Sequence, residues 1–559
     1  MENMILGENP RPDMMRKDTL VLNGLWDYGV NSTGEEEYDS KILVPFSPET
    51  EKSGIGRTLM PGETAYYRKR VRIVKEEGMR YILTFLAVDY YATVSINSRE
   101  VMKHEGGYLP FSEDITEHIS PDGNLEITVR VTDPTDSEAI ERGKQTLHPH
   151  RIWYRCQSGI WQSVYLEKVP ERYIRAIITT PNLDSSSLRI FPVSNTGERG
   201  SAELEIDGKK ILLEMDRENI IHIAEPHLWS PENPYIYHFK IRYGKDEVES
   251  YTAMRKFSII SDEKGIRRLA LNNRAIFHHG ILDQGYMKNS LLTYESDEAI
   301  VKDLETVKAM GFNVIRKHIK IESPRWYYHA TRLGLIVWQD MVNGGANYRD
   351  FAVTLPLFTT SFMRDRRNRL LSRRNDEEKK RYESFIKESI MYLYSVPCIG
   401  MWCIFNEGWG QFDSSRILSE IRKLDNTRTI DITSGWHDQG AGDFLSKHVY
   451  FRPYRFKKDR KGRCVLLSEF GGIGLGEEES NAKKFTYSDV SSSDELLKEI
   501  TKMYERDVIP YIEKGLSASI YTQLSDVEQE TNGLISYDRK RIKVPIHGMK
   551  ELSKRLVIH

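Results

Sequence analysis

From about Ile260 onward, short apolar runs alternate with segments of helical character, and this alternation constrains the fold more than any other feature of the 559-residue sequence. Eight runs are predicted to be strands: AIFHHGIL, FNVIRKHI, GLIVWQDM, CIGMWCIF, RTIDITS, KHVY, CVLLSEF and LSASIYTQL. Helical segments are predicted at Ser296–Met310, Pro324–Leu333, Glu377–Tyr394, Ser414–Leu424 and Ser492–Tyr511. Eight such units in roughly 300 residues are typical of a (β/α)8 barrel.

Two β-rich blocks precede the predicted barrel. Between Leu20 and Val169, alternating runs such as RYILTFLAV and YATVSINS are separated by Gly, Asp, Asn and Pro, which is typical of a sandwich or jelly roll. The second block, from about Arg172 to Ile260, has the length of an immunoglobulin-like sandwich. We therefore predict three domains: a β jelly roll at 1–169, an immunoglobulin-like β-sandwich at 170–260 and the (β/α)8 barrel at 261–559.

Charge and apolar patterning exclude several classes of function. The formal net charge is only -2, so the chain lacks the basic field of nucleic-acid binders, and we expect neither nucleic acid nor a membrane surface as a partner. The first twenty residues contain no apolar signal region, and no window approaches the roughly 20 apolar residues of a membrane span. We expect a cytoplasmic protein. Cys398, Cys403 and Cys464 lie in apolar runs and are expected to be buried free thiols, whereas Cys156 is undecided.

Two glutamates lie at the ends of predicted barrel strands. Glu407, in MWCIFNEGWGQFD, directly follows the fourth strand, and Glu469, in CVLLSEFGG, ends the seventh. Because the C-terminal ends of parallel barrel strands meet at one mouth, we expect the two carboxylates to face each other. Glycosidic cleavage uses such a pair, in which one carboxyl group protonates the leaving oxygen and the other attacks the anomeric carbon or activates a water. For each glutamate alone, a structural ion pair or a helix-cap contact is the alternative.

Several segments together resemble glycoside hydrolase family 2, which includes β-galactosidases, β-glucuronidases and β-mannosidases: FNEGWGQFD, LLSEFGG, LWSPENPYIY, HEGGYLPFSEDI, SGIWQSVYLE and GFNVIRKHIKIESPRWYYHATRLGLIVWQDM. The resemblance covers nearly the whole chain and implies the same domain order, with the sugar-binding jelly roll first and the catalytic barrel last. It implies that Glu407 is the general acid and base, that Glu469 is the nucleophile of a retaining mechanism, and that Asn406 binds the sugar 2-hydroxyl.

The two carboxyl groups need opposite properties, because Glu407 must hold a proton near neutral pH while Glu469 stays ionised. Arg316, which matches a family arginine at the end of the second strand, and Tyr450, after the sixth, are the expected neighbours of Glu469. The remaining candidates for contact with the sugar are Asp340, His448, Trp409 and Trp436, and packing is the alternative for the last three. Gln523 and Asp526, after the eighth strand, have open roles.

Three features depart from the family pattern. His318 comes one position earlier than the family histidine after the second strand, so its contact with substrate is left open. The Asn-x-Lys signature by which β-glucuronidases recognise the sugar carboxylate is missing from ETNGLISYDRK after the eighth strand, and the same letters at Asn481–Lys483 are interpreted as chance. The barrel is the last predicted domain, a plan nearer to β-glucuronidases than to large β-galactosidases.

The predicted connection between the third and fourth strands, at 343–380, is long for a barrel. It contains seven arginines: Arg349, Arg364, Arg366, Arg367, Arg369, Arg373 and Arg374. A solvated basic helix is one interpretation, and a lid or a subsite for an acidic group is the other.

These patterns predict a retaining, exo-acting β-glycosidase that removes a terminal sugar from an oligosaccharide or glycoside. A β-galactoside is the first expectation, because that activity is the commonest in the family the chain resembles. The alternatives are a β-glucuronidase, a β-mannosidase or arabinosidase, a non-catalytic carbohydrate-binding protein, and a barrel enzyme of acyl or phosphoryl transfer. We expect no required cofactor or metal, although a bound Mg or Na ion stays open. A homo-oligomer is compatible with a loop-rich barrel mouth.

Overall fold

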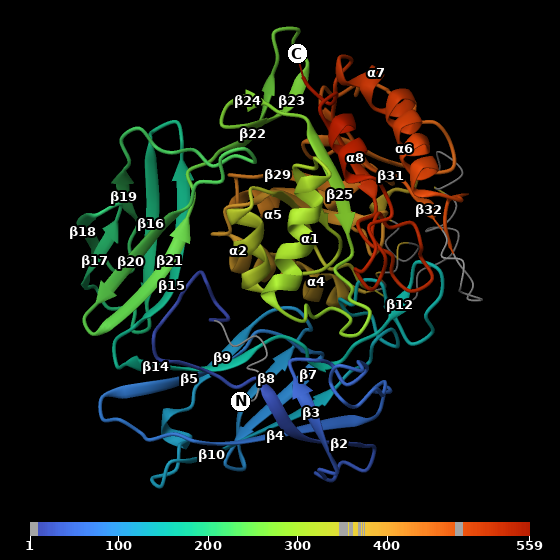
Figure 1. Ribbon diagram of the computed structural model, residues 1–559. Coiled ribbons are helices and arrows are strands. Elements are labelled where there is room, and N and C mark those ends of the chain that lie inside the picture. Colours follow the sequence, from blue (N-terminus) through green and yellow to red (C-terminus); the bar gives the residue numbers. More distant parts are fainter. Residues whose placement is uncertain are drawn as a thin grey trace.

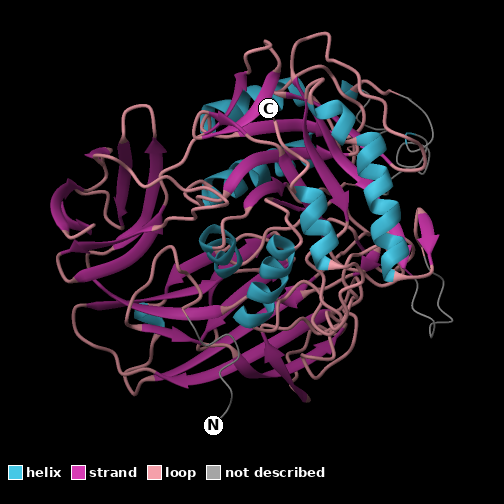
Figure 2. Cartoon of the chain, turned by 45° about the horizontal axis from the view of Figure 1, so that its top comes forward, coloured by secondary structure: helices cyan, strands magenta, loops and turns pink. Residues whose placement is uncertain are grey.

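The structure is a computed structural model, and it describes residues 9–345, 356, 362–366, 371, 373, 375–475 and 485–558. Figure 1 shows three bodies in chain order, a first β domain in blue at the bottom, a second in green at the left and a barrel in yellow to red. Helices gather in the third body, whereas the first two consist almost entirely of strands and loops (Figure 2). The predicted fold class is confirmed.

The first domain is a β-sandwich of two main antiparallel sheets, ordered β1-β14-β5-β9 and β3-β2-β4-β10-β7-β8. Buried and partly exposed residues alternate along its strands, as in β7, where every second residue is buried. Their bounds are β1 (Thr19–Val21), β2 (Gly24–Asn31), β3 (Ser40–Val44), β4 (Thr64–Arg72), β5 (Met79–Phe85), β6 (Val88–Asp89), β7 (Tyr91–Ile96), β8 (Arg99–Glu105), β9 (Phe111–Asp114), β10 (Asn124–Thr132), β11 (Gln145–Thr146), β12 (Tyr154–Arg155), β13 (Gly159–Ile160) and β14 (Val164–Pro170).

The second domain packs two smaller antiparallel sheets around a core of its own, ordered β15-β16-β19 and β18-β17-β20-β21. Its strands are β15 (Ile174–Asn182), β16 (Ser187–Ser194), β17 (Ser201–Ile206), β18 (Lys209–Glu214), β19 (Asn219–His222), β20 (Tyr237–Tyr243) and β21 (Asp246–Thr252). A small sheet of β22 (Phe257–Ser261), β23 (Arg267–Leu271) and β24 (Arg274–Ala275) leads into the barrel.

The barrel consists of eight parallel strands, and all eight coincide with runs predicted from the sequence. They are β25 (His278–Asp283), β26 (Val314–Lys317), β27 (Ile336–Asp340), β28 (Ile399–Asn406), β29 (Thr429–Ser434), β30 (Phe444–Val449), β31 (Cys464–Gly471) and β34 (Leu516–Thr522). The hydrogen-bonded order is β29-β28-β27-β26-β25-β34-β31-β30, and β29 and β30 at its two ends lie in contact. The sheet is therefore a nearly closed barrel.

Helices cover only part of the barrel's outside. They are α1 (Asp297–Ala309), α2 (Pro324–Arg332), α4 (Asp376–Leu393), α5 (Ser414–Leu424), α6 (Ser493–Asp507), α7 (Ile509–Ile512) and α8 (Ile546–Ser553), and a short pair, β32 (Ile473–Leu475) and β33 (Ser488–Val490), precedes α6. The five predicted helical segments are confirmed, with the last divided into α6 and α7. In the fully described segments 435–443 and 450–463, which flank β30, the chain forms no helix.

A loop of the first domain, residues 133–158, reaches the barrel mouth. The backbone N–H groups of Arg142 and Gly143 donate to the carbonyl of Asn343, at 3.2 and 2.8 Å. The Trp153 ring lies 5.2 Å from that of Trp409, measured between centroids. Buried side chains of the first domain, including Tyr108, Tyr154 and Trp161, belong to the same hydrophobic cluster as the barrel core. Two domains therefore build the mouth together.

None of the described helices is both long and apolar enough to cross a membrane. All four cysteines are buried free thiols, as predicted for three of them, and Cys156 joins that group.

Candidate active site

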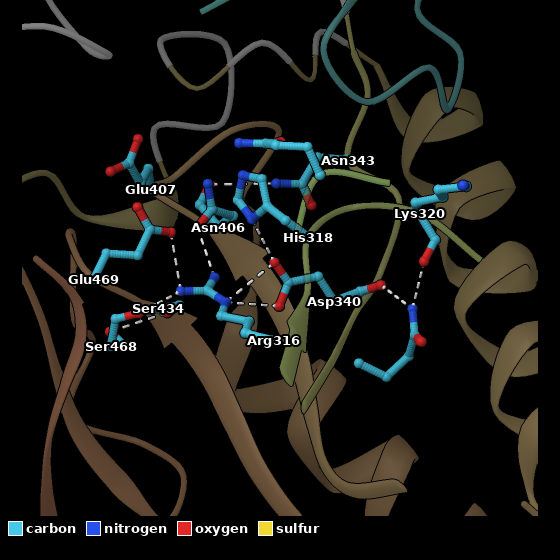
Figure 3. Close-up of polar contacts among 12 residues, drawn as sticks. Arg316, His318, Lys320, Asp340, Asn343, Asn406, Glu407, Ser434, Ser468 and Glu469 are labelled. Carbon is cyan, nitrogen blue, oxygen red and sulfur yellow. Dashed lines mark hydrogen bonds and ion pairs between the residues drawn. The ribbon is translucent and has the colours of Figure 1, made fainter. Parts of the chain in front are cut away.

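The guanidinium of Arg316, at the C-terminal end of β26, is fully buried at the centre of the barrel mouth. Its Nη1 donates to Oε1 of Glu469 at 3.0 Å and its Nη2 to Oδ1 of Asn406 at 2.8 Å. Its Nε donates to the Asp340 carboxylate at 3.0 Å. Figure 3 shows the guanidinium between these three side chains, which come from three different strands. One cation thus fixes the positions of the groups around it.

Glu469 lies on β31 and is held by two donors. Besides Arg316, the hydroxyl of Tyr450 donates to its Oε2 at 2.5 Å. Burial, with the charge of Glu469, raises the pKa of Tyr450 well above its usual range, so this hydroxyl keeps its proton. The Tyr450 ring stacks on that of Tyr487 with centroids 4.2 Å apart. A cation and a hydroxyl donor both favour the ionised form of the carboxylate.

Glu407 directly follows β28, and its backbone adopts a left-handed conformation with φ of 51°. This conformation is uncommon for a residue with a side chain and turns the carboxyl group at the strand end. Burial raises the pKa of Glu407 well above its ordinary value, and the charge of Glu469 adds to the rise. The two carboxyl groups therefore differ as acid catalysis requires, because Glu407 is held in its protonated form while Glu469 is contacted by a cation and a hydroxyl donor.

His448, from β30, contacts both Arg316 and Glu407. Burial, together with the charge of Arg316, lowers its pKa well below the ordinary value, so the ring is neutral. Arg316 Nη1 donates to Nε2 at 3.2 Å, and a guanidinium can only donate, so the ring hydrogen lies on Nδ1. Nδ1 lies 2.8 Å from Oε1 of Glu407. Because Oε1 accepts this hydrogen bond, the proton of Glu407 lies on Oε2, where it is available for transfer.

Ligand atoms of Glu407, His448 and Glu469 lie within 4.8 Å of one another. Retaining glycosidases hold their two carboxyl groups about 5–5.5 Å apart, whereas inverting enzymes need about 6.5–9.5 Å to admit a water. The separation therefore matches attack by a carboxylate on the anomeric carbon. The same three residues could offer ligand atoms to a metal, but Arg316 lies beside Glu469 and His448 and would repel a cation there. The set suits proton transfer better than metal binding.

Asn406 presents an unused donor to the mouth. Its Oδ1 accepts from Arg316, which fixes the orientation of the amide, while its buried Nδ2 has no hydrogen-bond partner among the described residues. Buried polar groups without partners are rare and need an explanation. A substrate hydroxyl would supply the missing acceptor.

Asp340, which was expected to bind a sugar hydroxyl, contacts two side chains of the mouth. Its carboxylate accepts from Arg316 Nε at 3.0 Å and from Nδ1 of His318 at 2.8 Å. The side chain is almost fully buried. Burial alone would raise the pKa of Asp340, but Arg316 and His318 hold it below the usual value. Asp340 thus positions Arg316 and His318, and its contact with a sugar stays a prediction.

The aromatic candidates lie around the same mouth. Trp409 packs between Trp153 and His318, whose ring centroid is 6.4 Å away. Trp436 follows β29, and its ring centroid lies 6.2 Å from that of His448. Its buried indole nitrogen has no hydrogen-bond partner in the part of the chain that the structure describes.

The two residues with open roles after β34 belong to polar networks. Gln523 exchanges side-chain hydrogen bonds with Gln284 and Asn532, both at 2.8 Å. Asp526 accepts from the ammonium of Lys543 at 2.8 Å. These contacts hold the chain after the eighth strand in place.

Sequence reasoning missed Lys144, which lies in the first-domain loop and is only 6% exposed. Burial and Glu469 raise the pKa of Glu407, and the Lys144 ammonium opposes that rise, so it is near enough to act on this carboxyl group. The ammonium lies 5.2 Å from the centre of the Tyr154 ring and makes no ion pair with a described residue. No periodic pattern marks this residue, because its position depends on how two domains pack.

The arginine-rich connection is only partly described. Arg349, Arg367, Arg369 and Arg374 lie outside the described residues, as does the segment Asn481–Lys483. Arg364 and Arg366 are exposed. Arg373 is fully buried, with its guanidinium 4.3 Å from the ring centre of Tyr382 and 3.7 Å from Glu141 of the first domain. A solvated basic helix does not describe Arg373, because this side chain joins two domains.

Three family models match consecutive parts of this chain. Residues 22–170 match the sugar binding domain of glycosyl hydrolases family 2, residues 174–257 match the model named glycosyl hydrolases family 2, and residues 265–462 match the TIM barrel domain of the same family.

Individual relatives are distant. The chain is 23% identical over 460 residues to a β-galactosidase of Thermoanaerobacter pseudethanolicus, covering 74% of this chain and 55% of that protein. It is 22% identical over 480 residues to a β-glucuronidase of Bacteroides fragilis, covering 78% and 64%. The matched part of this chain therefore spans between about half and two thirds of the length of these two relatives. Among solved structures, the β-D-glucuronidase of Dictyoglomus thermophilum aligns over 98% of this chain and 99% of its own, with a TM-score of 0.75 at 18% identity.

Proposed function

Because this chain belongs to glycosyl hydrolases family 2, we propose that it is a retaining, exo-acting β-glycosidase with Glu407 as general acid and base and Glu469 as nucleophile. The observation that carries the proposal is the pair of carboxyl groups within 4.8 Å of each other, one raised in pKa and the other held by Arg316 and Tyr450. A protein that only binds sugars has no need of such a pair.

The reaction then has two steps. In the first, Glu469 attacks the anomeric carbon, the bond to the leaving oxygen breaks, and that oxygen takes the proton from Oε2 of Glu407. In the second, the ionised Glu407 removes a proton from a water molecule, which attacks the anomeric carbon and releases Glu469. His448 keeps Glu407 oriented through both steps. Asn406 Nδ2 donates to the sugar 2-hydroxyl, a contact that strengthens in the transition state.

We propose a β-uronide as the terminal sugar. Lys144 is buried and its ammonium makes no ion pair with a described residue, which is costly unless the substrate brings an anion such as the carboxylate of a uronic acid. The β-glucuronidases among the relatives and solved structures support this choice over the β-galactoside expected from the sequence. A β-galactoside is the second candidate, since the Thermoanaerobacter β-galactosidase matches over a similar length.

An aryl-glycoside panel tests the proposal. Purified protein and the Glu469→Gln variant are assayed on the β-glucuronide, β-galacturonide, β-galactoside, β-mannoside and β-glucoside of one phenol. We expect release from a uronide and a loss of at least about a thousandfold in the variant. The control is Glu420→Gln, which changes a half-exposed carboxylate on α5 that pairs with Lys423.

Product stereochemistry separates the mechanisms. NMR during turnover should show the β anomer first, and a first-formed α anomer would rule out retention. If no glycoside is cleaved while sugars still bind, the protein is a carbohydrate-binding protein and the proposed enzyme activity is wrong. Cleavage of the galactoside alone would reject the uronide.

A further inference from the structure

A basic cavity lies beside the proposed catalytic centre, on the outer side of β30. Its volume is about 650 Å³. Four cationic side chains line it, together with Trp436, His437 and His448: Lys447, Arg452, Arg455 and Lys457. We call this cavity the basic groove.

The groove lies where the two described connections that flank β30 form no helix. Successive side chains of a strand point to opposite faces, so Leu445, Lys447 and Val449 face outward from β30 while His448 faces the barrel interior. In most (β/α)8 barrels, a helix would cover such outward residues. The segments 435–443 and 450–463 form no helix here, and the three outward residues line the groove instead.

Burial lowers the pKa of Lys447 and the charge of nearby Asp438 opposes that fall, but no cation of the groove makes an ion pair with a described residue. Lys447, Arg452, Arg455 and Lys457 make no ion pair and no side-chain hydrogen bond with a described residue. Asp438 is the acidic residue among the described lining residues, and its carboxylate is held by Arg463 at 2.7 Å. The groove therefore keeps an excess of positive charge, with four cations to one acid among its described lining residues, although the whole chain is close to neutral.

Two side chains connect the groove with the catalytic centre. His448 lines the groove and also contacts Oε1 of Glu407 at 2.8 Å. Trp436 lines it as well, and it is only 7% exposed with an unpartnered indole N–H among the described residues. Because Glu407 delivers the proton to the leaving oxygen, its side of the mouth is where the leaving group lies. The groove is thus placed next to the aglycone.

We propose that the basic groove binds an anionic group, a carboxylate or a sulfate, on the sugar that forms the leaving group, so that the natural substrate is an acidic oligosaccharide. Trp436 then contacts that sugar, and Lys447 and Arg452 bind its anion. This inference rests on the proposed function, since it takes Glu407 as the acid, and it adds a second subsite to the terminal-sugar pocket.

The test compares disaccharides that share a terminal sugar and differ in the leaving group. The second sugar is neutral in one, a uronic acid in another and carries a 6-sulfate in a third. We expect kcat/KM to be at least about tenfold higher for one anionic disaccharide than for the neutral one, and the preference to shrink toward unity at about 0.5 M NaCl. The two anionic arms decide between carboxylate and sulfate.

A double variant assigns the preference to the groove. Lys447→Gln with Arg452→Gln should reduce the anionic-to-neutral ratio of kcat/KM by about tenfold. Lys458→Gln is the matched control, since Lys458 is exposed in the same loop but does not line the groove, and its ratio should equal that of the parent protein. Equal kcat/KM on all three disaccharides, or a preference that survives the double variant, would overturn the inference.

The experiments distinguish an error in the groove proposal from an error in the proposed function. If no disaccharide and no aryl glycoside is cleaved, the proposed function is wrong, and calorimetric binding of the same disaccharides then tests the groove directly. Tighter binding of an anionic disaccharide that is lost in the double variant would support the groove without catalysis. Equal binding of all three would reject it.

Discussion

The substitution Asn406→Ala tests the contact on which transition-state binding should depend most. The Nδ2 group is buried without a described partner, so a substrate acceptor would satisfy it. A hydrogen bond to a group that gains charge contributes about 1.5–3 kcal/mol, which corresponds to about a 10- to 150-fold loss in kcat/KM. The alanine also removes Oδ1, which accepts from Arg316 at 2.8 Å, and a buried N–H without an acceptor costs about 1–3 kcal/mol of stability.

The assay is a double-change cycle, in which one change is made in the enzyme and the other in the substrate. Parent and variant are compared on an aryl glycoside and on its 2-deoxy analogue, each with the sugar that the panel identifies. The loss should appear with the 2-hydroxy substrate and disappear with the 2-deoxy substrate, because the latter cannot use the amide. Thermal unfolding of both proteins separates the stability effect from the kinetic one.

Asn343→Ala is the matched control for this cycle. Asn343 is a buried asparagine whose Nδ2 donates to the backbone carbonyl of Asn406 at 3.3 Å. Its loss should lower stability and should affect the two substrates equally. The reasoning is refuted if Asn406→Ala slows the 2-deoxy substrate as much as the 2-hydroxy one, because Asn406 would then only position Arg316.

Four further predictions concern the side chains around the proposed catalytic centre. The raised pKa of Glu407 predicts that kcat/KM falls as pH rises through it, and Glu407→Ala, assayed with a dinitrophenyl leaving group that needs no proton, should lack this alkaline limb. Because a raised folded-state pKa makes the ionised carboxyl destabilising, Glu407→Gln should raise the melting temperature at pH 8 and not at pH 4; an equal change at both values would contradict the buried acid. Tyr450→Phe keeps the stack on Tyr487 and removes one donor to Glu469, so kcat/KM should fall by about 10- to 150-fold with little change in melting temperature, and an unchanged rate would exclude the contact from catalysis. Lys144→Met should reduce kcat/KM for a β-uronide by about a hundredfold more than for the matching β-galactoside, and equal losses would remove Lys144 from specificity.

The barrel and its central residues were accessible from the sequence because both depend on local patterns. Each strand is an apolar run bounded by turn residues, and the ends of parallel strands must meet at one mouth, so Glu407 and Glu469 could be paired across 62 positions. Tyr450 followed from the same rule, whereas Arg316 was implied by the resemblance to the family at the end of the second strand. These assignments needed no knowledge of how the loops fold.

The remaining features depend on packing between distant segments. Lys144 and Trp153 reach the mouth on an irregular loop of another domain, and no sequence period encodes that approach. The partners of Asp340 could not be deduced either, since a carboxylate at a strand end is equally compatible with a sugar or with a guanidinium. That the described segments 435–443 and 450–463 form no helix was not predicted, because the eight predicted strands alone were compatible with a barrel.

The first-domain loop at the barrel mouth places the proposed choice of sugar on a different domain from the proposed chemistry. The groups proposed to make and break bonds lie on barrel strands, where substitution disturbs a tightly packed interior. Lys144 and Trp153 lie instead on a connection between sandwich strands, where the backbone tolerates insertion and exchange. Substitutions in this loop of the sandwich should therefore alter which sugar is accepted. The groups on the barrel strands would keep their places. A barrel expressed without its sandwich would lose selectivity together with the wall of its pocket.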